Sequence, residues 1–126
     1  MATSSGMVTF GGWTAENDLS TKQFYAVETG TNAGEVDVCD GATDLVVGIL
    51  QNDPTAGQAC EVAIGGIAKA IAGGTISRGN RVGTDSSGKL VAKTSDADLV
   101  CGIAVDAAVT DDIFRVLLTL NCQRAS

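Results

Sequence analysis

The sequence DLVVGI at residues 44–49 returns as DLVCGI at residues 98–103, a displacement of 54 residues without a gap. The same displacement places AGEVDV, residues 33–38, on SGKLVA, residues 87–92. The matching positions are apolar residues and a turn glycine, which together define where a β-strand runs and where it ends. The sequence therefore predicts two pseudo-repeats built from short strands.

Two copies of this length account for residues 19–126 and leave residues 1–18 outside. The expected pseudo-repeats are about 19–72 and 73–126. A solenoid needs three or more stacked repeats. We therefore expect residues 19–126 to form a single pseudo-symmetric β domain.

The apolar runs between these landmarks predict strands. They are rich in Val and Ile and are bounded by Gly, Asp, Asn, Ser or Thr. The expected strands are 23–27, 35–38, 45–50, 59–64, 67–71, 81–84, 89–93, 99–105 and 113–120. Hairpin turns are expected at 29–34 and 85–88, where a glycine supplies the positive φ of such turns. Since no window keeps a helical period, the sequence indicates an all-β fold, a small β-barrel or sandwich.

Residues 1–18 differ in kind, because Thr, Ser and Gly surround three large side chains, Met7, Phe10 and Trp13. This composition predicts an extended N-terminal arm. The large side chains either anchor the arm in a neighbour's pocket or pack back on their own barrel. Phe24 and Tyr25 join them as candidate contact residues at the first expected strand. Neighbours on a strand point to opposite faces, so one of the two is expected in the core.

Composition excludes several function classes. The chain has 126 residues, 15 acidic and 8 basic side chains, no histidine and a net charge of −7. Without histidine there is no Ser-His-Asp triad, Cys-His dyad or His-ligated zinc. The negative charge argues against nucleic acid as a partner, because phosphate contacts need clustered Lys and Arg. At 44% hydrophobic the chain can bury a core, and a chain of this size favours self-association or docking to bury more surface.

Membrane partners are not expected either. The N-terminal residues lack the cationic and apolar regions of a signal peptide. The longest apolar stretch, residues 62–76, is interrupted by Lys69 and four glycines. It is too short and too broken to span a bilayer.

The four cysteines are spaced by about twenty to forty residues, and no C-x-x-C occurs. This spacing gives no support to a zinc or thioredoxin-like site. They are Cys39, Cys60, Cys101 and Cys122. We expect reduced thiols that act as small hydrophobic side chains. The alternative is one or two bridges formed late in an extracellular particle, for which three pairings exist.

The remaining motifs do not support catalysis or ligand binding. Residues 86–89 contain S-x-x-K, but they fall in an expected hairpin turn and lack the partner motifs. The glycine-rich run 65–74 has no phosphate-binding pattern. Several acids could ligate calcium through oxygen, but no D-x-[DN]-x-[DN]-G loop is present; they are Asp37, Asp40, Asp44, Asp111 and Asp112. We expect no catalytic, cofactor or metal site, and therefore not an enzyme.

Residues 45–69, LVVGILQNDPTAGQACEVAIGGIAK, closely resemble the core of tailed-phage capsid cement or head decoration proteins. The likeness continues through 72–82, 85–89 and 100–104, and covers about residues 23–120. The order of G-I-L-Q-N-x-P-x-A-G, A-G-G-x-I-x-x-G, D-x-x-G-K and G-I-A makes it fairly specific.

The resemblance implies a non-enzymatic structural protein of the virion. Such proteins are small β-rich modules on the outer face of an expanded icosahedral shell, often as trimers near three-fold positions. The implied partners are the major capsid protein, whose neighbouring subunits the module bridges, and further copies of itself in a homotrimer. The alternatives are a carbohydrate- or host-surface-binding module displayed on the virion and a small hydrolase that uses Asp or Glu.

Overall fold

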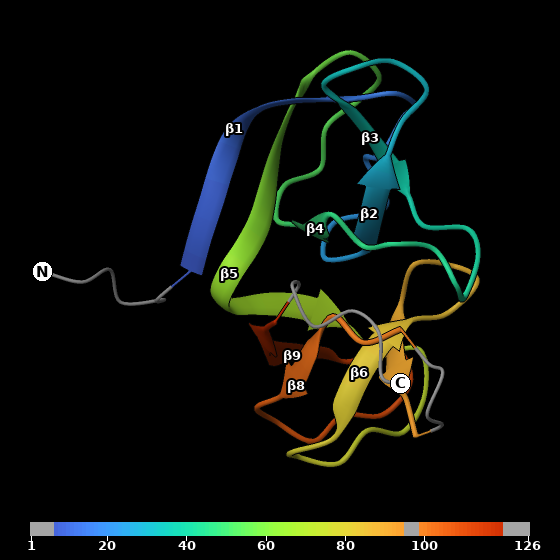
Figure 1. Cartoon of the computed structure of the whole chain (residues 1–126), viewed down its shortest axis with the longest axis vertical. Helices are drawn as coiled ribbons and strands as arrows, with labels where there is room; N and C mark the ends of the chain where they lie inside the picture. The colour runs from blue at the N-terminus through green and yellow to red at the C-terminus, as the bar shows by residue number, and fades with distance from the viewer. Residues whose placement is uncertain (1–6, 95–98, 120–126) are drawn as a thin grey trace, which may run out of the picture.

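Strands dominate the computed structural model, which describes residues 7–94 and 99–119 (Figure 1). Nine strands pair into one continuous sheet. They are β1 (Met7–Ala15), β2 (Ala26–Thr29), β3 (Glu35–Val38), β4 (Gly48–Leu50), β5 (Ala59–Ile71), β6 (Arg81–Thr84), β7 (Leu90–Ala92), β8 (Gly102–Ala104) and β9 (Ile113–Leu118). The described residues include no helix, so the expected all-β class is confirmed. Accordingly, these ranges contain no helix that could cross a membrane.

The first five strands close into a barrel. Their order is β1-β3-β2-β4-β5, and β1 pairs with β5 as well as with β3. Residues 7–15 of the expected arm are therefore the strand that closes this ring, beside the first half of β5 (Figure 1). Of the two alternatives for this segment, the described residues follow the one in which it packs on its own barrel. Residues 1–6 lie outside the described residues.

A second ring forms around the other half of β5, in the order β5-β9-β8-β6-β7. Leu90 of β7 returns to Ala72, just after β5, through a parallel bridge. The backbone N–H of Gly73 also donates to the Leu90 carbonyl at 2.7 Å. Two strands were expected at 59–64 and 67–71, but β5 is continuous. Figure 1 shows β5 bending between the two rings. Gly66, at φ +72°, is the last residue of β5 that pairs with β1, and Ile67 is the first that pairs with β9.

Corresponding strands in the two rings pair in the same register. Ile49 of β4 lies opposite Ala63 of β5, and Ile103 of β8 lies opposite Leu117 of β9. Each pair is displaced from the other by the 54 residues seen in the sequence. The duplication stays a prediction that this register supports. The structural halves meet within β5, whereas the expected repeat boundary lies at residue 72.

Glycines allow close backbone approach inside both rings. A Cβ on Gly48 would lie 2.4 Å from the Ala63 carbonyl oxygen, and a Cβ on Gly102 would lie 2.6 Å from the Leu117 carbonyl oxygen. The hairpin prediction is confirmed by Gly34 at φ +83° and Gly88 at φ +89°.

The buried side chains form two core clusters. The first core contains Ala15, Leu19, Val27, Val36, Leu50, Cys60 and Val62. The second core extends from the first barrel into the second ring, and it contains Ile49 of β4 with Ile76, Val82, Leu90, Phe114 and Val116 among others. Cys39, Cys60 and Cys101 are buried with free thiols, as expected for small hydrophobic residues. Cys122 lies outside the described residues.

Candidate functional site

Three of the expected contact residues lie on β1, which β5 holds in place. In the antiparallel register Met7 faces Gly66, Phe10 faces Val62 and Trp13 faces Cys60. The register shifts between Phe10 and Trp13, where Gly11 and Gly12 together lie opposite the single residue Glu61. Trp13 is half-buried and packs against the first core. Its indole therefore supports its own barrel. The side chains of Met7 and Phe10 lie outside the described part.

Phe24 and Tyr25 lie in a turn, because β2 begins only at Ala26. The expectation that one is core and the other outward is wrong, since both are half-buried. The backbone at Phe24 has φ +73°, which is rare for a large side chain. Its N–H donates to the Leu50 carbonyl at 2.7 Å, and its carbonyl accepts from Ile71 N–H at 3.0 Å. These two bonds tie β4 to the far end of β5, and they hold the strained conformation in place.

Tyr25 is fixed on its other side. The Lys22 ammonium lies 4.9 Å from the centre of the Tyr25 ring, within the range of a cation–π contact. The Tyr25 carbonyl accepts from Leu50 N–H at 2.9 Å. The ring is thus positioned at the surface where the two barrels join.

Two neighbouring grooves lie beside β1 and Phe24, and of the expected contact residues only Phe24 lines one of them. A groove of about 370 Å³ is lined by Gln23, Phe24, Gln51, Glu61, Ile67, Ala68 and Lys69. Another, of about 310 Å³, is lined by Thr9, Gly11, Asn52, Ala59, Cys60 and Glu61. Glu61 lines both, so the structure brings β1 and the Phe24 turn to adjacent depressions. Sequence reasoning had not assigned the groove residues Gln51 and Asn52 to the candidate site. Gln51 Nε2 donates to the Lys69 carbonyl at 3.0 Å, and Asn52 Oδ1 accepts from Glu61 N–H at 2.9 Å.

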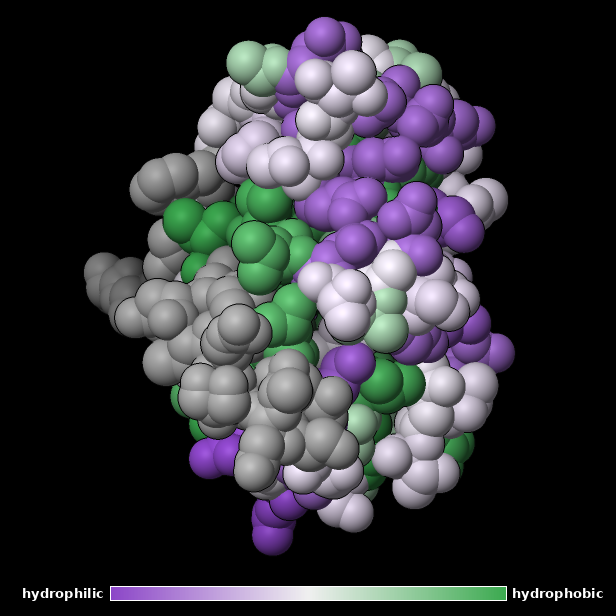
Figure 2. All heavy atoms as spheres, turned by 45° about the vertical axis from the view of Figure 1, so that its right-hand side comes forward, coloured by the Kyte–Doolittle hydropathy of each residue, from purple (hydrophilic) through white to green (hydrophobic). Residues whose placement is uncertain are grey.

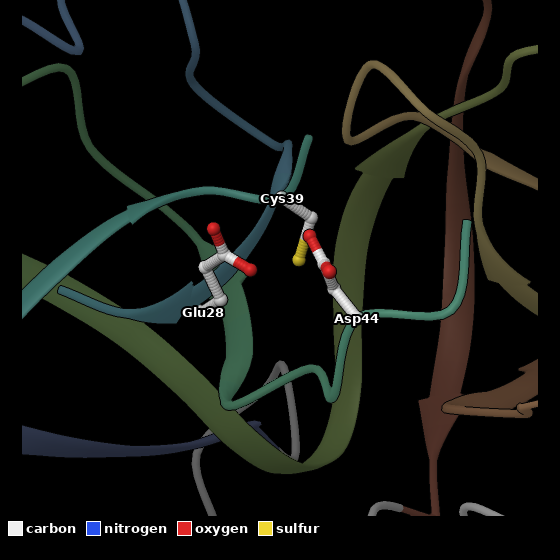
Figure 3. Close-up of side chains that lie close together, drawn as sticks. All are labelled: Glu28, Cys39 and Asp44. Atoms are coloured by element: carbon white, nitrogen blue, oxygen red, sulfur yellow. The ribbon is translucent and has the colours of Figure 1, made fainter. Parts of the chain in front are cut away.

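A second cluster gathers Glu28, Cys39 and Asp44, whose side-chain ligand atoms lie within 4.8 Å of one another (Figure 3). Glu28 comes from β2, Cys39 follows β3, and Asp44 lies in the next loop. The sequence had indicated Asp44 among loop acids, but only the pairing of β2 with β3 brings Glu28 to it. Asp44 also accepts from the backbone N–H groups of Asp40 at 3.0 Å and Gly41 at 2.9 Å.

The carboxyl groups of Glu28 and Asp44 form a hydrogen bond that shifts the pKa of both. Desolvation, followed by the hydrogen bond to Asp44, raises the pKa of Glu28 to about 7. The same hydrogen bond lowers the pKa of Asp44. Burial and the two carboxylates raise the pKa of the Cys39 thiol far above its ordinary value. A neutral thiol is a poor nucleophile and a poor metal ligand at neutral pH. The cluster therefore offers a proton-linked carboxylate pair and no activated cysteine.

Large apolar side chains are also exposed in the described part. They are Leu45, Ile103, Val109, Ile113 and Leu117. On the side shown in Figure 2, several groups of hydrophobic side chains reach the surface, and hydrophilic residues lie beside them. The strand β9, IFRVLL, alternates exposed and buried positions, and it places Ile113 and Leu117 outward. This signal was present in the sequence, because an almost wholly apolar strand with one buried face must expose apolar residues on the other.

Comparisons with known proteins agree with this architecture. Residues 13–120 match the family model described as phage cement protein. The fold is similar to the crystal structure of the head fiber gp8.5 N base in bacteriophage phi29, with a TM-score of 0.69 and 16% identity over 95% of this chain and 98% of that chain. No match was found among curated proteins. The family match begins at Trp13 in β1, ahead of the resemblance expected from about residue 23, and it spans strands of both rings. By this match, the chain belongs to the phage cement protein family.

Proposed function

We propose that this chain stabilises a phage head by binding its outer surface and bridging neighbouring major capsid subunits. The observation that carries the proposal is the family match over residues 13–120, which includes strands of both barrels. Membership makes the chain a phage capsid structural protein at the exterior of the virion. The bridging role and the identity of the capsid subunit are the parts proposed here.

The architecture supports a bridging role. A bridge needs two separate contact surfaces on one rigid body. Here a single strand, β5, belongs to both barrels, and the backbone of Phe24 links β4 to Ile71 at the end of β5. The two barrels can therefore transmit force between two attached subunits without a flexible linker.

Physical chemistry explains how such binding stabilises the head. A protein that binds the mature shell, and not its disassembled subunits, stabilises the shell by mass action. Repeated attachment over a symmetric lattice adds avidity to weak individual contacts. The net charge of −7 is compatible with an outer surface, since the packaged genome lies inside.

We further propose that copies associate as a homotrimer, with Met7, Phe10, Trp13, Phe24 and Tyr25 at or near contacts. The support is that Phe24 and β1 border neighbouring grooves on the surface of the first barrel and its junction with the second. Trp13 packs against its own core but is only half-buried, so part of it stays accessible to a neighbouring copy.

The proposal is tested with heads that lack this chain and purified protein added back. We expect saturable binding, with a copy number set by the lattice, and a rise in the temperature at which heads release DNA. Phe24→Ala should weaken binding, since it empties the wall of a groove, whereas Val109→Ala, at an exposed position outside both grooves, should not. Saturating binding with no change in head stability would contradict the proposal and favour a displayed module that binds carbohydrate or a host surface.

A further inference from the structure

The outward face of β5, β9 and β8 is apolar and positively charged. Ile103 and Leu117 lie opposite each other across β8 and β9. Their exposed fractions are 38% and 40%, and that of Ile113 on the same face of β9 is 48%. Lys69 lies opposite Arg115 across β5 and β9. We call these five residues the β9 face.

The charge of the β9 face is opposite to that of the whole chain, which carries −7. Arg115 binds Asp106 at 2.8 Å, while Lys69 is exposed beside it. On the next strand Arg81 lies opposite Ile103 and adds a further cation. Like charges opposite each other in a sheet are unfavourable. The placement of Lys69 beside Arg115 therefore suits a partner surface that carries carboxylates and apolar side chains.

Such a surface lies on the chain itself. Leu45, with an exposed fraction of 65%, is the most exposed of the large apolar side chains in the described residues. Asp44 precedes it, and the exposed Asp40 lies at the start of the same loop. We call Asp40, Asp44 and Leu45 the β3–β4 loop tip.

One copy cannot bring its own two surfaces together. The Ala42 carbonyl accepts from Lys93 Nζ at 3.5 Å, so the loop lies beside the end of β7. In the second ring β9 is separated from β7 by β5 on one side and by β8 and β6 on the other. Figure 1 shows the loop that follows β3 at the right-hand edge of the molecule, away from β9.

We propose that the β9 face of one copy binds the β3–β4 loop tip of a second copy, head to tail. Leu45 then packs among Ile103, Ile113 and Leu117, and the exposed Asp40 carboxylate approaches the exposed Lys69 ammonium. This inference rests on the self-association proposed above and adds two further surfaces to the contacts proposed there. A head-to-tail contact closes into a ring when the rotation between copies allows it, as a homotrimer requires.

Charge exchange tests the contact. Sedimentation velocity at low salt should show that Lys69→Glu and Asp40→Lys each raise the dissociation constant on the order of tenfold, since each replaces attraction by repulsion. The double variant should regain association, because it exchanges the two charges. Asp53→Lys is the matched control, since Asp53 is exposed and lies outside both surfaces.

Leu45→Ser tests the apolar part of the contact. It should weaken association and leave the unfolding midpoint unchanged, because Leu45 is mostly exposed within one copy. Val109→Ser removes another mostly exposed apolar side chain, outside both surfaces, and serves as its control.

The outcomes separate this inference from the proposals above. A wild-type chain that stays monomeric at tens of micromolar contradicts self-association itself. An oligomer that survives Lys69→Glu and Leu45→Ser contradicts only the assigned surfaces. If those two variants keep the oligomer but lose binding to heads, the β9 face contacts the capsid, and the head-to-tail contact is overturned.

Discussion

Substitution of Gly48 or Gly102 by alanine should destabilise the fold strongly and to a similar extent. A Cβ at residue 48 would lie 2.4 Å from the Ala63 carbonyl oxygen, and one at residue 102 would lie 2.6 Å from the Leu117 carbonyl oxygen. Ordinary van der Waals contact begins at 3.4 Å. The difference from each distance gives the shift that the facing backbone must make, which is about 1 Å for Gly48→Ala and about 0.8 Å for Gly102→Ala. Overpacking of this kind costs about 1–3 kcal/mol. Because the obstacle in each case is backbone of a paired strand, we expect a loss of about 2–3 kcal/mol.

Urea unfolding provides the measurement, with the free energy of unfolding taken at a common slope. Gly74→Ala is the control, since its Cβ would meet only a side-chain carbon at 3.8 Å. We expect that control to change stability by less than about 1 kcal/mol. A loss below about 0.5 kcal/mol for either Gly48→Ala or Gly102→Ala would refute the close-approach argument. A large loss for one glycine only would contradict the equivalence of the two rings.

Three further outcomes are expected. Glu28 has a pKa of about 7 in the folded protein against an ordinary 4.5, so its contribution to stability is present below pH 4.5 and is lost as pH rises through 7. In urea unfolding, Glu28→Gln should therefore be more stable than wild type by up to about 1 kcal/mol at pH 8, after allowance for partial exposure, and equally stable at pH 4. A stability difference that does not change with pH would contradict the carboxylate pair. In a Cys122→Ser background, mass spectrometry after iodoacetamide treatment should show no modified thiol in the native protein and three after unfolding. The reason is that the cysteines in the described residues are buried and that the pKa of Cys101 is raised to about 12. Rapid labelling of the native protein would contradict their burial. Phe114→Ala should lower the free energy of unfolding in urea by about 3–5 kcal/mol, since it opens a cavity in the second core. Its control, Val109→Ala at the surface, should lower that free energy by less than about 0.5 kcal/mol. Equal losses for the two variants would refute this packing.

Local sequence was sufficient where a strand and its turn are specified by neighbouring residues. The expected strands 35–38 and 81–84 coincide with β3 and β6. The hairpin glycines Gly34 and Gly88 have the positive φ that the turn pattern predicts. In both hairpins the paired strands are adjacent in the chain, so the pattern and the contact agree.

The strand β1 could not be found in this way. Two adjacent glycines interrupt its apolar pattern, and its partners lie at 59–66 and 35–36, far along the chain. Strand formation there depends on an edge that only the folded barrel provides. The same reason explains Phe24, whose φ of +73° follows from hydrogen bonds to Leu50 and Ile71 and not from its own preference.

The candidate surfaces were predictable only in part. The apolar outward positions of β9 could be read from IFRVLL once one face was taken as buried. The proximity of Glu28 to Asp44 could not, because it depends on the pairing of β2 with β3 and on the path of the following loop. Which charged side chains lie close together depends on the pairing of strands, and a local sequence pattern does not contain that information.

The bridging role is tested most directly by cryo-electron microscopy of heads that carry this chain. We expect density for both barrels on the outer surface, with each copy in contact with at least two major capsid subunits. Copies that each contact a single subunit would contradict the bridging role.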